Sequence, residues 1–439
     1  MTDAAERLAR LVRTPLGGSL PLRIRAWDGS EAGPPGGPVL VVRNRRALRR
    51  LLWKPGELGL GRAWVAGDLD IDGDLYEALS RFFGAAPNLT TTRRDTLRAL
   101  AALRDTGNLR LAVEALRLAG SPVPPAPPRE EARRRRGRLH SLRRDREAIT
   151  HHYDVGNDFY SLILGPSMVY SCAYWESPHA TLEEAQTAKL DLICRKLGLR
   201  PGQRLLDVGC GWGAMVTHAA ERYGVTAVGI TISEEQAAFA RKRLAAAGCS
   251  DRAEIRVQDY REIEDGPYDA ISSIGMAEHV GSVQFRAYAD TMHKLLKPGG
   301  RFLNHQISCR PHVDGTPYRI GEFMDRYVFP DGELAPVGTT ASVLEEAGFE
   351  VRDVEALREH YALTLRAWVA NLERGQAEAA RLTTPGRARV WRLYMAASAL
   401  AFEQNRIGVN QILAVRTTPA GNAKMPPTRQ QLLTAGAMA

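Results

Sequence analysis

The chain has 439 residues, and at roughly 150 residues per domain this length allows two or three domains. Hydrophobic residues make up 44% and charged residues 25%, a globular composition that excludes a disordered protein and a disulfide-stapled mini-domain. No segment approaches the ~20 consecutive apolar residues of a membrane span, and the charged N-terminus MTDAAERLARLV does not resemble a secretory signal. We therefore predict a cytoplasmic protein.

The cysteines and the net charge indicate which kinds of site and partner to expect. The five cysteines are scattered and none forms a CxxC pair, so the sequence predicts neither a metal site nor a disulfide framework. The net charge of +9 favours binding to polyanions, either nucleic acid or an anionic membrane face. Because the arginine-rich run lacks interleaved aromatic residues and any recognition motif, no nucleic-acid partner is expected.

The first third of the chain is predicted to hold a small domain and a linker. In residues 1–120, short strand-like runs (LPLRIRAW, PVLVVRN) occur with helical patterns (ALRRLLW, LYEALSRFF), which indicates a smaller N-terminal α+β accessory domain. Residues 121–148 form a Pro/Arg-rich linker, in which five prolines between Pro122 and Pro128 prevent a helix. The arginines beyond them predict a basic amphipathic helix over 133–146.

The rest of the chain alternates strands and helices. RLLDVG, VTAVGITI, EIRVQDY, YDAISSIG and RFLNHQIS read as strands, and helices of ten to fifteen residues separate most of them. This order predicts an α/β fold with a doubly wound, mostly parallel sheet over residues 149–415, with helical additions after residue 339. Residues 416–439, rich in Pro, Gly, Thr and Gln, are predicted to be a flexible tail.

The sharpest motif is LLDVGCGWG, residues 205–213. Gly209, Gly211 and Gly213 let the turn after the first strand approach a ligand closely. Asp207 at the strand tip suits a cationic amino-acid ligand better than a pyrophosphate. A dinucleotide site would prefer GxGxxG and an acid ending the second strand, where none occurs before Glu234. The motif therefore favours a methyltransferase with S-adenosylmethionine, with NAD binding or a structural turn as alternatives.

Several further motifs carry a resemblance to a known family. With HHYDVGNDFY (151–160), VYSCAYW (169–175), SIGMAEHVG (273–281) and HYALTL, the chain resembles the cyclopropane-fatty-acid synthases and their mycolic-acid and methyl-branching relatives over about residues 147–415. The resemblance implies a class I S-adenosylmethionine-dependent methyltransferase fold. It places cofactor contacts at Tyr170, Ser171, Gly209, Thr231, Gln236, Tyr260 and Ile274.

The same resemblance implies a base and the residues around it. Family members hold a bicarbonate ion, and the matching positions are Cys172, Glu278, His305, Ile307 and Tyr361. For Cys172 and His305 the alternative is an ordinary buried core residue, and for Tyr361 an amphipathic helix. Tyr153 is a candidate to face a cation through its ring. Glu147 is a candidate to assist or replace the base, the alternative being a surface salt bridge to a nearby arginine.

These residues predict methylation of the cis double bond of phospholipid-bound acyl chains through a carbocation. Loss of a proton from the transferred methyl group closes a cyclopropane, whereas a hydride shift and then proton loss give a methylene branch. RYVFPDGEL and LREHYALTLRAW resemble the branch of the family that makes 10-methylene (tuberculostearic-type) chains, so we predict that product, with cyclopropane as the alternative. A small-molecule methyltransferase and a non-enzymatic membrane-binding protein are competing hypotheses.

This chemistry also indicates the expected partners. The lipid substrate implies peripheral association with the inner face of the cell membrane. A methylene product implies a reductase that saturates it, and a homo-oligomer is left open.

Overall fold

The computed structural model describes residues 3–13, 18–85, 106–132, 155–312 and 318–434, and the chain divides into two compact units. The first unit takes in residues 1–134, 321–330 and 375–400, and the second takes in 135–320, 331–374 and 401–439. The four-part division at residues 120, 148 and 415 stays a prediction. It did not anticipate that two late segments fold with the N-terminal residues.

The first unit is built on a small mixed sheet with strand order β2-β1-β3-β4, packed with helices around an apolar core. Its strands and helices agree with the α+β pattern of the sequence, and no helix forms across Pro122–Pro128. The elements are α1 (Ala4–Arg13), β1 (Arg23–Arg25), β2 (Glu31–Ala32), β3 (Val39–Val42), α2 (Arg46–Trp53), α3 (Glu57–Val65), β4 (Leu69–Asp72), α4 (Leu75–Ala85), α6 (Thr106–Ala119), α14 (Glu322–Tyr327), α17 (Gln376–Leu382) and α18 (Pro385–Glu403) up to residue 400.

Two buried polar contacts explain why the late segments belong to this unit. The Glu131 carboxylate, 3% exposed, accepts hydrogen bonds from Arg62 Nε at 2.7 Å and from Arg326 Nη2 at 3.0 Å. On α18, the Arg389 guanidinium lies 4.4 Å from the ring centroid of Trp64, whose Nε1 donates to the Arg389 carbonyl at 2.9 Å. Each contact couples residues far apart in sequence, so composition alone could not indicate them.

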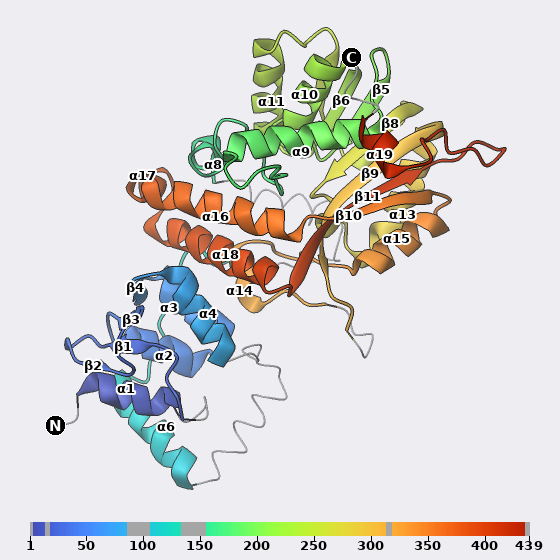
Figure 1. Ribbon diagram of the computed structural model, residues 1–439. Helices are drawn as coiled ribbons and strands as arrows, with labels where there is room; N and C mark the ends of the chain where they lie inside the picture. The colour runs from blue at the N-terminus through green and yellow to red at the C-terminus, as the bar shows by residue number, and fades with distance from the viewer. Residues whose placement is uncertain (1–2, 14–17, 86–105, 133–154, 313–317, 435–439) are drawn as a thin grey trace. The chain divides into compact units, whose positions relative to one another are not determined.

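The second unit is a seven-stranded sheet of order β10-β11-β9-β8-β5-β6-β7 (Figure 1). Among the described strands of this sheet, β11 runs antiparallel to both of its neighbours, and the other pairings are parallel. The strands are β5 (Arg204–Val208), β6 (Thr226–Thr231), β7 (Ala253–Val257), β8 (Tyr268–Ile274), β9 (Leu296–Cys309), β10 (Glu350–Ala356) and β11 (Ile407–Val415). The predicted doubly wound sheet is confirmed.

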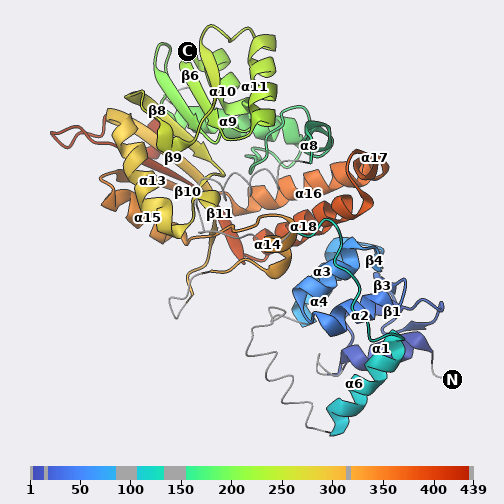
Figure 2. The ribbon, with the colours of Figure 1, turned by 180° about the vertical axis from the view of Figure 1, so that it is seen from behind.

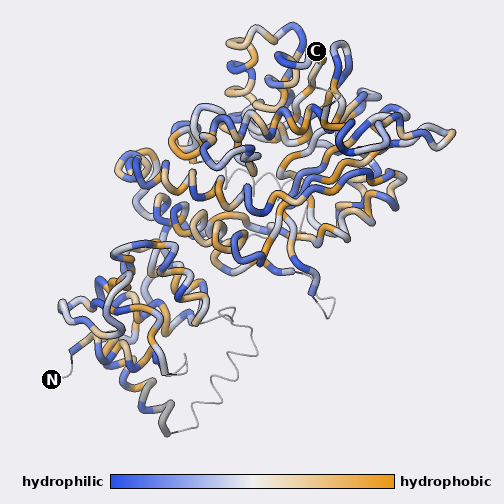
Figure 3. Tube along the Cα trace, in the orientation of Figure 1, coloured by the Kyte–Doolittle hydropathy of each residue, from blue (hydrophilic) through white to orange (hydrophobic). Residues whose placement is uncertain are grey.

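Helices cover both faces of this sheet (Figure 2). Alternate strand residues point to opposite faces, so Leu205 packs in one apolar cluster and Leu206 in the other. The first cluster includes residues of α9, α10 and α11, and the second includes residues of α13 and α15; Figure 3 shows apolar and polar residues alternating along these helices. The helices are α8 (Asn157–Leu164), α9 (Leu182–Leu197), α10 (Ala214–Tyr223), α11 (Glu234–Ala246), η1 (Tyr260–Glu262), α12 (Ala277–Val280), α13 (Ser282–Leu295), α15 (Val337–Glu346), α16 (Arg358–Arg374) and α19 (Arg429–Thr434).

Strands β10 and β11 and helix α19 were not predicted from the sequence. Strand β10 is hard to recognise because its acidic residues interrupt the apolar pattern; Asp353 and Glu355 pair with the buried Lys196, at 3.1 and 2.6 Å. Helix α19 lies in the segment expected to be a flexible tail, yet its Leu432 is buried in the first apolar cluster. Part of that tail is therefore packed.

Within the described ranges, no helix is both long and apolar enough to cross a membrane.

Candidate cofactor site and adjoining polar cluster

The turn after β5 opens a pocket at the carboxyl edge of the sheet. β5 lies between β6 and β8, where the strand order changes direction, and doubly wound folds bind ligands at such a point. Gly209 and Gly211 adopt φ of +78° and +53°, a region that glycine enters without strain. A Cβ at Gly211 would meet no atom within 4 Å among the described residues, so this turn faces open space that a ligand can fill.

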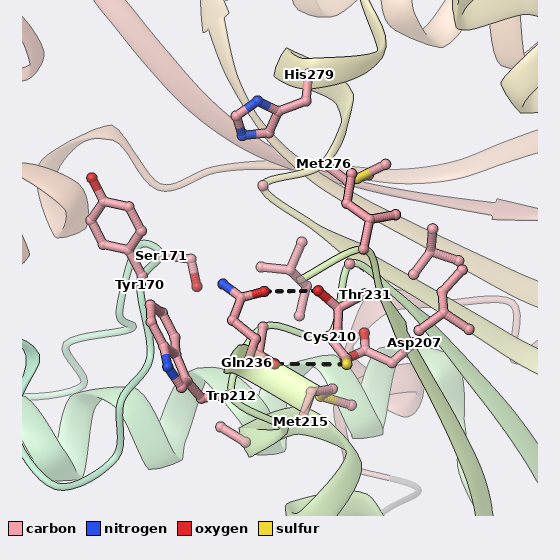
Figure 4. A pocket seen from close by; sticks show the side chains of 18 of the residues that line it. Tyr170, Ser171, Asp207, Cys210, Trp212, Met215, Thr231, Gln236, Met276 and His279 are labelled. Atoms are coloured by element: carbon pink, nitrogen blue, oxygen red, sulfur yellow. Dashed lines mark hydrogen bonds between the residues drawn. The ribbon is translucent and has the colours of Figure 1, made fainter. Parts of the chain in front are cut away.

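Most of the predicted cofactor residues line this pocket (Figure 4). Figure 4 shows Tyr170 and Ser171 on one side, Thr231 and Asp207 on another, and His279 at a third edge. The predicted residues that line it are Tyr170, Ser171, Asp207, Gly209, Gly211, Thr231, Gln236, Tyr260 and Ile274. Gly213 is not among the lining residues. A Cβ there would lie 2.8 Å from Ala240 Cβ, so this glycine allows α10 and α11 to pack closely.

Asp207 supplies the negative charge at the strand tip. It is 2% exposed, and one carboxylate oxygen accepts a hydrogen bond from Ser272 Oγ at 2.6 Å. Burial raises the pKa of Asp207 to about 6, and the Ser272 hydroxyl and the Lys189 charge oppose that rise. Near neutral pH the group is a carboxylate, which suits a cationic ligand.

Hydroxyl and amide groups lie beside this carboxylate. Thr231 Oγ1 donates to Gln236 Oε1 at 2.8 Å, which fixes the Gln236 amide in the pocket wall. Tyr260 packs edge-on against Tyr288 with 5.1 Å between ring centroids, so its orientation is set by the core. A buried carboxylate, a glycine turn and neutral polar groups fit the charged amino-acid end and the nucleoside of S-adenosylmethionine.

Glu278 lies in α12, directly after β8. Its Oε1 accepts the Ile307 backbone N–H at 2.7 Å, whereas its buried Oε2 has no hydrogen-bond partner among the described residues. Burial raises the pKa of Glu278 to about 7, and the Ile307 N–H opposes that rise. Around neutral pH the group can therefore hold or release a proton.

His305 lies on β9 beside Glu278's partner Ile307. Its Nδ1 is 3.3 Å from Gln411 Nε2, and its Nε2 is buried without a hydrogen-bond partner in the described part of the chain. Burial lowers the pKa of His305 to about 3, with Lys189 and Lys196 adding to the effect, so the imidazole is neutral.

Cys172 and Tyr361 approach the same strand ends. Cys172 Sγ donates to the Ala173 and Leu357 carbonyls, and burial raises the pKa of this thiol well above its usual value, so it is no thiolate nucleophile. Leu357 N donates to the Val409 carbonyl, and Val409 pairs with Ile307 across the sheet. Tyr361, one turn into α16, donates its backbone N–H to the Leu357 carbonyl. The candidate residues Glu147 and Tyr153 lie outside the described residues, and their roles stay predictions.

Three charged residues of the pocket wall, Lys189, Asp259 and Arg261, were not predicted from the sequence. Asp259 lies just after β7 and pairs with Arg261 at 2.7 Å, and its place near the end of the predicted strand EIRVQDY was a usable signal. Lys189 had no such signal, because a lysine within a helix usually faces solvent.

The fold and the pocket define a class I methyltransferase, whose methyl donor is S-adenosylmethionine. The family model of mycolic acid cyclopropane synthetase matches residues 140–412. The chain is 43% identical over 419 residues to the probable fatty acid methyltransferase Rv3720 of Mycobacterium tuberculosis, covering 93% of this chain and 94% of that one. It is 38% identical over 270 residues to the cyclopropane-fatty-acyl-phospholipid synthase of Escherichia coli K12, covering 62% and 68%.

A solved structure agrees with these relatives. The mycolic acid cyclopropane synthase CmaA1, complexed with SAH and CTAB, superimposes with a TM-score of 0.58 at 34% identity, covering 61% of this chain and 97% of that one. The chain belongs to the mycolic acid cyclopropane synthetase family.

Proposed function

We propose that this enzyme, which acts on lipids, methylates the cis double bond of phospholipid-bound unsaturated acyl chains of the oleoyl type. The observation that carries the proposal is that a buried polar cluster adjoins the cofactor pocket. Glu278 lies between the pocket residues Met276 and His279, and His305 pairs in register with the pocket residue Ile274. Cys172 directly follows the pocket residue Ser171. Proton removal could therefore occur beside the site of methyl transfer.

S-adenosylmethionine supplies an electrophilic methyl group, and the residues of the chain control the fate of the methylated lipid. An alkene that accepts a methyl cation becomes a carbocation, which must lose a proton. Glu278 Oε2 and His305 Nε2, buried without hydrogen-bond partners in the described structure, fit a small hydrogen-bonding anion such as bicarbonate. Bicarbonate would supply a proton acceptor, and fixed polar groups around it would stabilise developing charge without reorganising.

The proposed product is a 10-methylene branch. The RYVFPDGEL and LREHYALTLRAW motifs support it, as does the similarity over nearly the whole chain to a probable fatty acid methyltransferase. The residues proposed to hold bicarbonate support the alternative, a cyclopropane. A methylene product would need a separate reductase to saturate it.

Transfer of labelled methyl groups tests the substrate. The protein is incubated with methyl-labelled S-adenosylmethionine and vesicles of dioleoyl phospholipid, and label is expected in the lipid fraction. Label only in added aqueous metabolites would indicate a small-molecule methyltransferase, and no transfer would favour a membrane-binding protein. Mass spectrometry of the released fatty acids then separates a methylene branch from a cyclopropane, because only the branch retains an alkene that hydrogenation reduces.

We further propose peripheral binding at the cytoplasmic face of the membrane through the arginine run at 133–136, which lies outside the described residues. Binding to anionic vesicles is expected to fall steeply with salt, because charges at a lipid surface are screened beyond a Debye length of ~8 Å at physiological ionic strength. Cosedimentation at increasing salt measures this, with all four arginines replaced by glutamine as the weakened variant. Binding that is unchanged at high salt would contradict the proposal.

Glu147 provides a test of the base. If bicarbonate is the base, Glu147→Gln is expected to keep full activity and to depend on bicarbonate added to degassed buffer. If Glu147 is the base, the same change should lower turnover by ~10²–10⁴-fold, and bicarbonate should have no effect. Measuring the turnover of the wild type and of Glu147→Gln, each with and without bicarbonate, distinguishes bicarbonate from Glu147 as the base.

A further inference from the structure

Helix α9 places a lysine inside the wall of the cofactor pocket. Lys189 is 1% exposed, and its Nζ donates a hydrogen bond to Ser171 Oγ at 2.9 Å. Both residues line the pocket together with Asp207. The proton transfer proposed for Glu278 and bicarbonate does not need this ammonium group, so its burial calls for a different explanation.

The same helix holds the neighbouring backbone. Gln186 lies one turn before Lys189 and is fully buried. Its Nε2 donates to the Ser171 carbonyl at 2.9 Å and to the Val169 carbonyl at 3.4 Å. Two side chains on one face of α9 therefore fix the segment that carries Tyr170, Ser171 and Cys172, which joins the cofactor pocket to the polar cluster.

Few groups near Lys189 stabilise its positive charge. Burial disfavours its protonated form and lowers the pKa of Lys189 to about 8, whereas the Cys172 thiol and Asp207 on β5 favour that form. His305 on β9 is neutral and feels the charge of Lys189. The other charged or titratable groups of the pocket wall are Asp259, Arg261, Tyr170, Tyr260, Cys210 and His279. At neutral pH a cation thus faces the pocket, and its charge disappears at alkaline pH.

We propose that Lys189 is a positioning residue that holds Ser171 in the pocket wall, and that its charge sets how the pocket discriminates between S-adenosylmethionine and S-adenosylhomocysteine. The proposal rests on the proposed function, which identifies S-adenosylmethionine as the ligand of the pocket. The two ligands share their amino-acid and nucleoside groups and differ in the sulfur, which is cationic in one and neutral in the other. A buried ammonium disfavours the cationic ligand, because like charges repel strongly where water is excluded.

Calorimetric affinities of both ligands between pH 6.5 and 9.5, measured without lipid, test the proposal. In the wild-type protein, the preference for S-adenosylmethionine is expected to rise roughly fivefold across this range as Lys189 loses its charge. Lys189→Met should bind S-adenosylhomocysteine about tenfold more weakly, because the hydrogen bond to Ser171 is lost, and its preference for S-adenosylmethionine should stay at every pH at the higher value that the wild type reaches at pH 9.5. Lys189→Gln keeps a donor for Ser171, so its affinity for S-adenosylhomocysteine should lie near wild type, while its preference for S-adenosylmethionine should also stay at the higher value at every pH.

Lys196→Met is the matched control. Lys196 is a second fully buried lysine of α9, but it pairs with Asp353 and Glu355 and is not a lining residue of the pocket. Its loss should lower the melting temperature and leave the pH-dependent preference intact. If Lys189→Met does not fold, Lys189→Gln provides the test. The proposal would be overturned if the ligand preference of Lys189→Gln changed with pH as much as that of the wild type. Wild-type protein that binds neither ligand would contradict the cofactor assignment itself, whereas identical profiles for wild type and Lys189→Met would contradict the role of Lys189 alone.

Discussion

Glu278→Gln is expected to lower the rate of methyl transfer to lipid by ~10²–10⁴-fold, the range typical of a lost acid–base group. The amide has nearly the shape of the carboxylate, and its oxygen can still accept the Ile307 N–H, a bond of 2.7 Å in the native protein. Only the charge and the proton-holding capacity are removed. Because Glu278 is not a lining residue of the cofactor pocket, the affinity for S-adenosylmethionine should stay close to wild type.

The pKa of Glu278 determines how turnover and stability should change with pH. Burial raises the pKa of Glu278 to about 7, so wild-type turnover should fall as the pH drops below about 7 and the carboxylate takes up a proton. The raised pKa also means that ionising Glu278 destabilises the folded state, and this loss of stability develops as the pH rises from about 4.5 through about 7. Glu278→Gln should lack that loss, so its melting temperature relative to wild type should increase with pH.

Glu333→Gln is the control for this variant. Glu333 is a nearby carboxylate whose backbone N–H donates to the Glu278 carbonyl, and its own Oε2 accepts the Ser282 N–H at 2.7 Å. Its replacement should leave turnover within about fivefold of wild type, since one hydrogen bond typically contributes only ~1 kcal/mol. Full activity of Glu278→Gln at pH 8 would exclude Glu278 from proton transfer.

The parts of the fold and site that could be predicted are those encoded by local pattern. Apolar runs separated by amphipathic helices indicated the parallel strands, and LLDVGCGWG identified the turn that opens the pocket. The motif could not distinguish its glycines, however. Gly209 and Gly211 line the pocket, whereas Gly213 is required where α10 approaches α11 at Ala240. That difference depends on packing between elements.

The features that could not be predicted depend on contacts between distant segments. Lys196 is buried because Asp353 and Glu355 of β10 neutralise it, and Lys189 is buried because Ser171 accepts its hydrogen bond. In the sequence, both lysines look like solvent-facing positions of an ordinary helix. Likewise, the two segments that fold with the N-terminal unit are joined to it by side-chain contacts such as Arg62–Glu131–Arg326.

Asp207→Ala is expected to weaken the binding of S-adenosylmethionine by about 100-fold or more, since the carboxylate is buried in the pocket wall and a charged partner contributes up to ~3 kcal/mol. Wild-type affinity should fall as the pH drops below about 6, where Asp207 becomes protonated, and the variant should lack that decrease. Asp207→Asn, which can still accept the Ser272 hydrogen bond, should lose most of the affinity with less loss of stability.

Asp269→Ala is the control, because this carboxylate lies at the opposite end of the sheet, where it accepts the Arg204 N–H at 2.8 Å. Calorimetry that finds near-native affinity in Asp207→Ala would contradict the assignment of this pocket to the cofactor.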